Sequence, residues 1–338
     1  MWKSLRYFWR MNLTVIGAVA VTTAVLTGAL LVGDSVRASL RSLTLDRLGK
    51  INYALISERF FHQRLGQESN EGNVAPAILL QGSATFNKMR ASNVQINGID
   101  SAFLSFFQSN ALDEKLDVTR GPFPPVIINE TLARELKTKE GDEILLAFSK
   151  PAEVHRETIL GNRDAAEVVQ RNRFKIAAVI SNEGVGRFSL SPNQHLPFNV
   201  FVPLNRIQRL LRQQGKVNAL LFSSKNRPDL KPYLKLQDLG LRLIEYSGVL
   251  SLESDEVILK PQIAQAALEA ANALQVKSFR VLTHLANAIS YQGRVVPYST
   301  VTAIEPPQSF INREGETVGP LLENEILLNE WAATDVQI

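Results

Sequence analysis

The stretch PPVIINETLARELKTKEGDEILLAF, residues 124–148, decides the fold. Its β-branched run predicts a strand that ends at Asn129, a residue type that commonly caps the start of a helix. Glu130 then falls in the first helical turn, where the helix macrodipole favours an acid. Gly141 and Asp142 predict a turn after that helix, and the apolar residues beyond them predict a return strand. We therefore interpret the Asn-Glu pair as a strand-to-helix junction, and a catalytic carboxylate at Glu130 is the alternative.

The same phrase returns near the other end of the chain. The stretch ILLNEWAATDV, residues 326–336, repeats the aliphatic run and the Asn-Glu pair as Asn329 and Glu330, and a Gly-Pro pair precedes both copies. Both copies predict a loop, an aliphatic strand and a helix, but the second stops before any turn or return strand. A strand left without its neighbour has an unpaired edge. We therefore expect a fragment that ends in an incomplete repeat of 121–136, and a natural end that merely resembles the motif is the alternative.

An uncharged apolar stretch near the N-terminus predicts a membrane helix over residues 13–33. At about 1.5 Å per residue it spans roughly 30 Å, the thickness of one hydrocarbon core, and its threonine hydroxyls can bond back to carbonyls of the same helix. Residues 1–12 mix aromatic and basic side chains, which predicts an interfacial segment on the cytoplasmic side. A cleavable signal peptide is the alternative, but this stretch is longer than such peptides and reaches Asp34 without a clean cleavage site.

The rest of the chain predicts an exported α+β protein. Residues 34–51 have apolar side chains at helical spacing and Gly49 as a stop, which predicts a stalk helix continuing from the membrane. Short strands and helices alternate over residues 52–226, which predicts a mixed core domain, with one helix closed by Gly215. Residues 227–338 predict a second region of paired strands and an alanine-rich helix.

Composition and motifs exclude several kinds of chemistry. Of the net charge of +4 over 338 residues, most comes from Lys3, Arg6 and Arg10, ahead of the apolar stretch, so the charge points to a membrane and not to nucleic acid. The sequence has no cysteine, which excludes thiolate metal sites and cysteine nucleophiles. Its four histidines lie far apart, and it has no phosphate-binding loop or nucleophile elbow. We predict no catalytic, cofactor-binding or metal-binding residue, no enzyme activity, and for NEGVGRF, residues 182–188, a loop.

Several segments together resemble the MacB-type, FtsX-like ABC transporter permeases. The resemblance lies in DSVRASLRSLTLDRLGKI (34–51), VQINGID (94–100), VIINETLARELKTKEGDEILLAF (126–148), FKIAAVIS (174–181) and FNVFVPLNRIQ (198–208). It implies one N-terminal transmembrane helix followed by a MacB-like periplasmic core domain of mixed sheets and short helices. Family members carry three further membrane helices after that domain. No apolar stretch of about 18 residues follows Gly33 in this sequence, so those helices are missing from it.

The resemblance implies a permease subunit that transmits ATP-driven motion from a separate ABC ATPase subunit to its extracytoplasmic domain. In such systems the motion serves export or release of lipids, lipoproteins, peptides or drugs. The expected location is the bacterial inner membrane, crossed once, with the N-terminus in the cytoplasm. The expected partners are the ATPase, a second permease subunit as dimer partner and membrane lipid, with no nucleic acid. The alternative is a membrane-anchored extracytoplasmic module that binds or assembles with a partner and has no transport activity.

Overall fold

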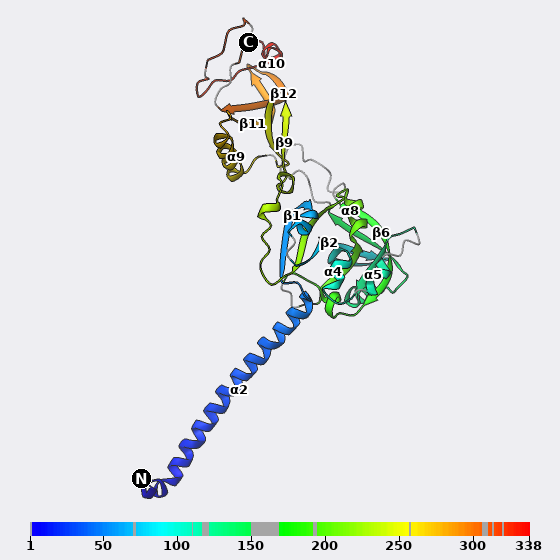
Figure 1. Ribbon diagram of the computed structural model, residues 1–338, viewed down its shortest axis with the longest axis vertical. Helices are drawn as coiled ribbons and strands as arrows, with labels where there is room; N and C mark the ends of the chain where they lie inside the picture. The colour runs from blue at the N-terminus through cyan, green and yellow to red at the C-terminus, as the bar shows by residue number, and fades with distance from the viewer. Residues whose placement is uncertain are drawn as a thin grey trace. The chain divides into compact units, whose positions relative to one another are not determined.

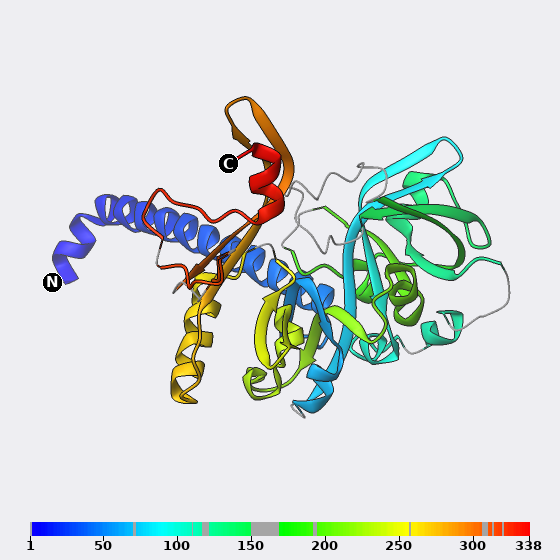
Figure 2. The same cartoon turned by 90° about the horizontal axis from the view of Figure 1, so that it is seen from above.

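The chain divides into two compact units. A computed structural model describes residues 2–69, 72–109, 111–116, 122–149, 169–191, 195–256, 258–305, 310–312, 314–319 and 321–338. Unit 1 comprises Met1–Pro151 and Ala165–Leu234, and unit 2 comprises Ala152–Asp164 and Lys235–Ile338. In Figures 1 and 2 unit 1 is drawn mostly in blue to green and unit 2 in yellow to red.

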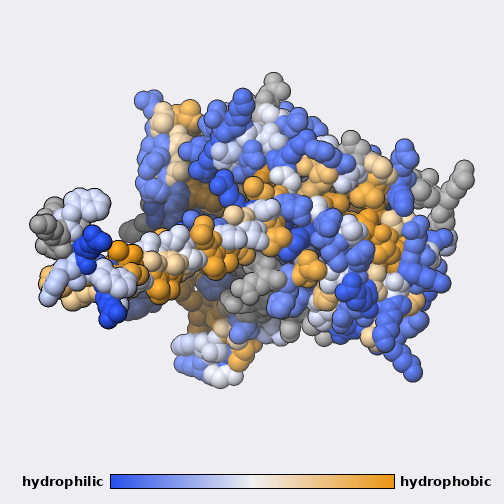
Figure 3. Space-filling model, turned by 90° about the horizontal axis from the view of Figure 1, so that it is seen from below, coloured by the Kyte–Doolittle hydropathy of each residue, from blue (hydrophilic) through white to orange (hydrophobic). Residues whose placement is uncertain are grey.

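Unit 1 begins with two helices, α1 (Trp2–Tyr7) and α2 (Trp9–Leu48). The 40 residues of α2 extend over about 60 Å at the usual helical rise. None of its residues is buried, and its apolar side chains lie on the surface in Figure 3. Within the described part of the chain, it is the one helix that is long and apolar enough to cross a membrane.

Two threonine side chains in the apolar part of α2 bond within the helix. Thr14 Oγ1 donates to the carbonyl oxygen of Met11 at 2.8 Å, and Thr22 Oγ1 donates to that of Ala18 at 2.9 Å. This confirms the bonding expected from the sequence. Because no water is present in a hydrocarbon core, such internal bonds lower the free energy of placing a threonine there.

The strands of unit 1 form one sheet that closes on itself. They are β1 (Tyr53–His62), β2 (Asn73–Phe86), β3 (Met89–Ile99), β4 (Pro125–Asn129), β5 (Glu143–Ser149), β6 (Val169–Ile180), β7 (Phe198–Pro203) and β8 (Lys216–Ser223). Their order is β1-β8-β2-β3-β7-β4-β6-β5. The last strand, β5, also pairs with β2, the third in this order, and this pairing closes the sheet. The β3–β7 and β4–β6 pairs are parallel, whereas the other pairs are antiparallel. The mixed sheet and short helices confirm the predicted α+β class.

Side chains of the central strands alternate between two hydrophobic clusters. On β4, Val126 and Ile128 belong to the first cluster, whereas Ile127 belongs to the second. Phe201 of β7, which pairs with Ile127, belongs to the second cluster as well. Because successive strand residues point to opposite faces, β4 separates two cores and is itself buried throughout.

Short helices cover the two clusters. Beyond α2, the helical segments of unit 1 are α3 (Arg64–Glu68), α4 (Ser101–Ser105), α5 (Ala111–Leu116), α6 (Glu130–Leu136), η2 (Gly184–Arg187), α8 (Leu204–Leu211) and η3 (Lys231–Tyr233). Helices α6 and α8 contribute Leu132, Leu136 and Ile207 to the first cluster. Helix α4 and the 3-10 turn η2 contribute Phe103 and Val185 to the second cluster. Ile51, just beyond the end of α2, also lies in the second cluster, so the long helix enters the sheet domain beside η2.

Helix α8 ends before Gly215, where the sequence predicted its end. It stops at Leu211, because Arg212 adopts a left-handed conformation with φ 58° and its N–H bonds to carbonyls of the last turn. Gly215, with φ 69°, instead lies in the turn that leads into β8. The prediction was wrong because an arginine here adopts the conformation that glycine usually supplies at a helix end.

The described residues of unit 2 form two hairpins, two α-helices and one 3-10 turn. Its elements are η4 (Leu236–Leu239), β9 (Leu241–Tyr246), β10 (Val249–Ser254), α9 (Pro261–Ala273), β11 (Arg280–Tyr291), β12 (Arg294–Glu305) and α10 (Glu330–Val336). The β9–β10 and β11–β12 ladders are both antiparallel. Each is closed by two residues with positive φ, Ser247-Gly248 and Gln292-Gly293, as the turns favoured in tight hairpins require.

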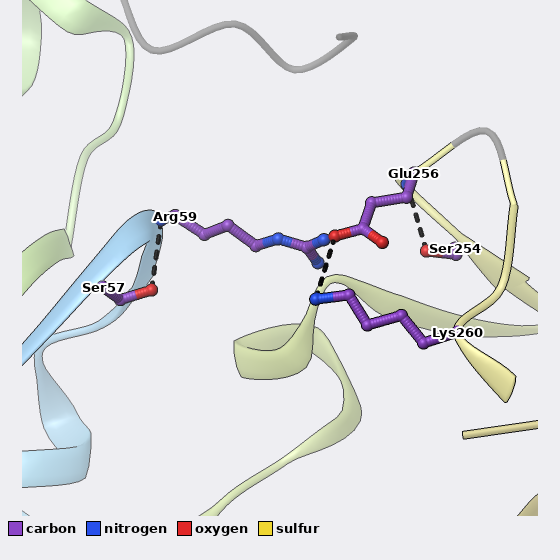
Figure 4. A network of polar contacts seen from close by, with 5 residues as sticks. All are labelled: Ser57, Arg59, Ser254, Glu256 and Lys260. Atoms are coloured by element: carbon purple, nitrogen blue, oxygen red, sulfur yellow. Dashed lines mark hydrogen bonds and ion pairs between the residues drawn. The ribbon is translucent and has the colours of Figure 1, made fainter. Parts of the chain in front are cut away.

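Local polar contacts order the segment between β10 and α9. The backbone N–H of Glu256 donates to Ser254 Oγ at 3.0 Å, and Lys260 Nζ lies 3.5 Å from Glu256 Oε1 (Figure 4). In unit 1, the backbone N–H of Arg59 donates to Ser57 Oγ at 3.1 Å within β1, as Figure 4 also shows. The Lys260 side chain is 60% exposed, and ion pairs with a solvated partner contribute little to stability, so these contacts mainly fix local geometry.

The second copy of the Asn-Glu phrase reproduces the helix of the first but not its strand. Residues 321–329 form no strand, although the sequence predicted one over the aliphatic run before Asn329. In the first copy β4 pairs with β6 and β7, and the described residues of unit 2 offer the second run no such neighbours. A strand needs a partner for its backbone groups, so apolar composition alone was not sufficient. Gly121 and Pro320 of the two Gly-Pro pairs lie outside the described residues.

Truncating a side chain in the first cluster is expected to destabilise unit 1. Leu132 on α6 is fully buried, so Leu132→Ala should lower the unfolding free energy by about 2–5 kcal/mol. Met89, at the start of β3, is 37% exposed, and Met89→Ala should change it by only about 0.5 kcal/mol. Denaturant unfolding of the full chain in detergent, followed by circular dichroism, measures both values. Equal losses in the two variants would contradict the packing described for α6.

Candidate functional site: the junction of the long helix and the sheet domain

Asn129, the first of the predicted motif residues, is a fully buried hydrogen-bonding centre. Its Oδ1 accepts from the backbone N–H of Leu132 at 3.2 Å, which caps α6, and from that of Asn199 at 3.2 Å. Its Nδ2 donates to the carbonyl oxygens of Gly186 at 3.0 Å and Pro197 at 2.7 Å. An asparagine side chain can make four hydrogen bonds, and this one makes all four while joining β4, α6, η2 and β7.

Asn199 on β7 bonds to the same turn. Its Nδ2 donates to the carbonyl oxygens of Gly186 at 3.1 Å and Phe188 at 2.9 Å. Its Oδ1 accepts from Nδ2 of Asn97 at 3.4 Å, so Asn199 is itself held by another buried asparagine. Gly186 is required where it stands, since a Cβ there would collide with the carbonyl oxygen of Ser181. The carbonyl of one residue in η2 is therefore held by two asparagines.

The end of α2 contacts the segment that these asparagines hold, residues 184–191, which we call the bridging segment. Asp46 Oδ2 accepts from the backbone N–H of Gly184 at 3.3 Å. Arg47 Nη1 donates to the carbonyl oxygen of Ser191 at 3.1 Å, and Ser189 Oγ donates to the same oxygen at 3.2 Å. A cation in the last helical turn is also favoured by the helix macrodipole. The bridging segment thus lies between the long helix and the sheet.

Gly49 ends α2 in a conformation that only glycine adopts readily. Its φ of 56° and ψ of −127° turn the chain, and its N–H donates to the carbonyl oxygen of Leu45 at 2.8 Å. This confirms the helix stop predicted from the sequence. A Cβ on Gly49 would lie 2.7 Å from the carbonyl oxygen of Phe106 and 2.9 Å from the ring of Phe107. Phe107 in turn packs edge-on against Phe188 of the bridging segment, with ring centroids 6.0 Å apart.

The other predicted residues of the first copy lie around α6 in two places. Glu130 is exposed beside Asn129, and its Oε2 accepts from Asn182 Nδ2 at 3.4 Å. Gly141 and Asp142 form the turn after α6, where Asp142 Oδ2 accepts from the N–H of Lys139 at 2.8 Å and from Thr138 Oγ1 at 2.9 Å. The structure thus places Asn129 and Glu130 beside the segment before η2, whereas the Gly-Asp pair serves the turn into β5.

Asn329 and Glu330 of the second copy lie in unit 2. Asn329 Oδ1 accepts from the N–H of Ala332 at 2.9 Å and caps α10. Helix α10 ends in Gln337 with φ 57°, just as α6 ends in Lys137 with φ 56°. Asn329 and Glu330 are both exposed, however, so the second copy repeats the cap without the buried network.

No metal centre is evident in the described part of the chain. No group of three or more His, Asp or Glu side chains there could hold a metal ion. An open hollow of ≈ 500 Å³ adjoins the junction, and its lining includes Asp46, Glu183, Ser109 and Leu112. The chemistry that the junction supports is mechanical attachment through hydrogen bonds and aromatic packing.

Sequence reasoning found the cap at Asn129 and the stop at Gly49 but missed the residues that join them. Asp46, Arg47 and Asn199 carried no recognisable signal, because a single aspartate, arginine or asparagine fits many surface positions. NEGVGRF was predicted to be a loop, but Gly184–Arg187 within it form the 3-10 turn η2, so the prediction holds only for the flanks of that turn. Its contact with α2 depends on residues separated by 138 or more positions in sequence, a relation that no local pattern contains.

Comparison with known proteins identifies a class of similar domains among solved structures. No protein-family model matches the chain, and no curated protein matches it. Two of the similar solved structures are the extracellular domain of an ABC-type transporter and the periplasmic region of MacB.

Two particular structures represent that class. The extracellular domain of the noncanonic ABC-type transporter YknZ from Gram-positive bacteria is 11% identical, over 49% of this chain and 74% of that one, with a TM-score of 0.31. The periplasmic region of MacB from Actinobacillus actinomycetemcomitans is 10% identical, over 62% of this chain and 83% of that one, also with a TM-score of 0.31. MacB, one of the two, also gives its name to the family that the sequence resembles.

Replacing Gly49 is expected to destabilise the protein more than replacing Gly141, which also has a positive φ but has free space around its Cβ position. Gly49→Ala combines a positive φ with a clash against Phe106, for an expected loss of roughly 1–3 kcal/mol in unfolding free energy. Gly141, with φ 94°, has no atom within 4 Å of its Cβ position, so Gly141→Ala should lose only the conformational part. Denaturant unfolding of the full chain compares them. A smaller loss for Gly49→Ala than for Gly141→Ala would show that α2 does not end against Phe106.

The pH dependence of stability is expected to carry opposite contributions from two aspartates. The N–H of Lys139 and the hydroxyl of Thr138 hold the pKa of Asp142 below its ordinary value. Its stabilisation is therefore complete above the unfolded-state pKa and is lost as the pH falls through the folded-state pKa. Burial raises the pKa of Asp100, the cap of α4, so its contribution to stability falls as the pH rises from the unfolded-state to the folded-state pKa.

Unfolding free energies measured against pH check both signs. Acidification should shrink the stability difference between the wild type and Asp142→Asn. Over the same acid range, the wild type should lose stability with rising pH relative to Asp100→Asn, which keeps a good cap. A difference that does not change with pH in either pair contradicts the corresponding hydrogen bonds or burial.

Proposed function

We propose that this chain is a permease subunit of an ABC transporter of the FtsX/MacB type. In this role α2 crosses the membrane once, residues 1–12 lie in the cytoplasm and the sheet domain lies outside. A separate ATPase subunit supplies the motion, because the sequence contains no phosphate-binding loop. The work would be export or release of a lipid, lipoprotein, peptide or drug, and a second permease subunit would be the dimer partner.

The observation that supports this proposal most directly is the continuity of α2. One helix runs without a break from the apolar segment to a capped end that is bonded to the sheet domain. A helix transmits displacement along its axis, whereas a flexible linker of the same length would absorb it. A domain tethered for simple anchoring does not require such a stiff connection, so the geometry favours transmission of motion.

Cysteine labelling of the full chain tests the orientation. The protein has no native cysteine, so Lys88→Cys in the exposed turn after β2 and Arg6→Cys in α1 each give one reactive site. With cells whose outer envelope has been made permeable, a membrane-impermeant maleimide should label Cys at position 88, because the sheet domain lies outside. It should label Cys at position 6 only after the membrane is disrupted. Labelling in the reverse order would exclude the proposed role.

A membrane-anchored binding or assembly module is the second candidate, and unit 2 supplies an observation in its favour. Its buried apolar side chains in the described residues are few: Leu241, Val296, Ala332 and Val336. Leu250 and Tyr298, by contrast, are 64% and 72% exposed, and apolar surface of this kind often marks a protein interface. Isolation of the full chain from membranes discriminates the two. A co-purifying subunit with ATPase activity supports the permease, and a partner without it supports the anchored module.

A further inference from the structure

We propose that Asn129 and Asn199 fix the direction of α2 by holding the bridging segment on the sheet. The two residues are positioning residues for the long helix, which neither of them touches in any described contact. This deepens the proposed function, because a helix that transmits motion needs a rigid attachment. The attachment itself exists without an ATPase or substrate, so its test and the test of the permease role can fail independently.

The hydrogen-bond geometry gives η2 two independent restraints from the sheet. The Gly186 carbonyl accepts from both Asn129 and Asn199, and Asn199 also holds the carbonyl of Phe188. All three asparagines of this network are at most 2% exposed. Buried polar groups lose water when they are enclosed, so an arrangement that satisfies every group strongly disfavours alternatives that leave some unpaired. The network therefore selects one position for η2.

The position of η2 in turn sets where α2 can dock. Both side-chain hydrogen bonds from the helix end to the bridging segment go to its backbone, at Gly184 and Ser191. Backbone groups cannot change rotamer to keep these bonds when the helix is displaced. The position of the bridging segment therefore determines the position of the helix end. A third restraint enters from β3, where Gln95 Nε2 donates to Ser189 Oγ at 3.2 Å. The sheet, the bridging segment and α2 form one chain of polar contacts.

The substitution Asn129→Ser separates capping from attachment. Serine is a good helix cap, so α6 should keep its first turn, but the shorter side chain lacks the amide that donates to Gly186 and Pro197. Asn199→Ser removes the restraint that the Asn199 amide places on η2, and it leaves the cap of α6 unchanged. Asn218 is a matched control: it is 8% exposed and makes two bonds of 2.8 Å to the backbone of Leu79, between β8 and β2.

Two measurements on the full chain in lipid nanodiscs read the attachment. Hydrogen exchange reports local opening at the amides of Gly186 and Phe188, which bond within the turn. Loss of the asparagine amide should speed exchange there by about tenfold or more, because a buried carbonyl loses a partner. Spin labels at Arg41→Cys on α2 and Lys88→Cys in the turn after β2 report the helix direction as a distance distribution. Both sites are exposed, and no native cysteine interferes.

Asn129→Ser and Asn199→Ser should each speed exchange in η2 and broaden the distance distribution, while amides of α6 in Asn129→Ser exchange at the wild-type rate. Asn218→Ser should lower stability without either change. The proposal is overturned if the distribution keeps its width while η2 opens, or if Asn218→Ser broadens it equally. Should Asn129→Ser fail to fold, Asn199→Ser alone decides, since it leaves the cap intact.

Discussion

The arrangement of unit 1 depends on the burial of one side-chain amide. Asn129 stands at the last residue of a central strand, where water cannot reach, so its oxygen and nitrogen must find partners inside the protein. The partners come from three other stretches of chain, and their mutual positions are fixed once the amide is satisfied. The end of β4, the start of α6 and the turn η2 are thereby held in fixed positions relative to one another.

Much of this framework was readable from local sequence. The β-branched run, the capping asparagine and the glycine stop each act through neighbours within a few residues, and the structure contains all three. Local sequence did not indicate the other three hydrogen bonds of the Asn129 side chain. Gly186, Pro197 and Asn199 lie 57 to 70 positions away, and nothing in their own neighbourhoods indicates an approach to Asn129. Long-range polar contacts arise from topology, which local patterns do not specify.

The second Asn-Glu phrase separates these two levels of information. Asn329 adopts nearly the same backbone conformation as Asn129 and caps a helix of the same length, so the short-range signal is sufficient for the cap. The preceding aliphatic run forms a strand in one copy only, because only there do β6 and β7 supply backbone partners. The two copies show that the residues of the motif are sufficient to form its helix. Its strand and its buried network depend on partners in the surrounding fold.

The bridging segment has a mechanical consequence for the outermost strand. The chain passes from α2 directly into β1, which pairs with β8 alone and whose first residue, Tyr53, lies opposite Phe222. Tension applied to the helix would otherwise peel this edge strand away one pair after another, starting at that point. The contacts of Asp46 and Arg47 divert the pull to interior strands, where several bonds must break together. The fold is thereby protected from unzipping at the place where it is most easily opened.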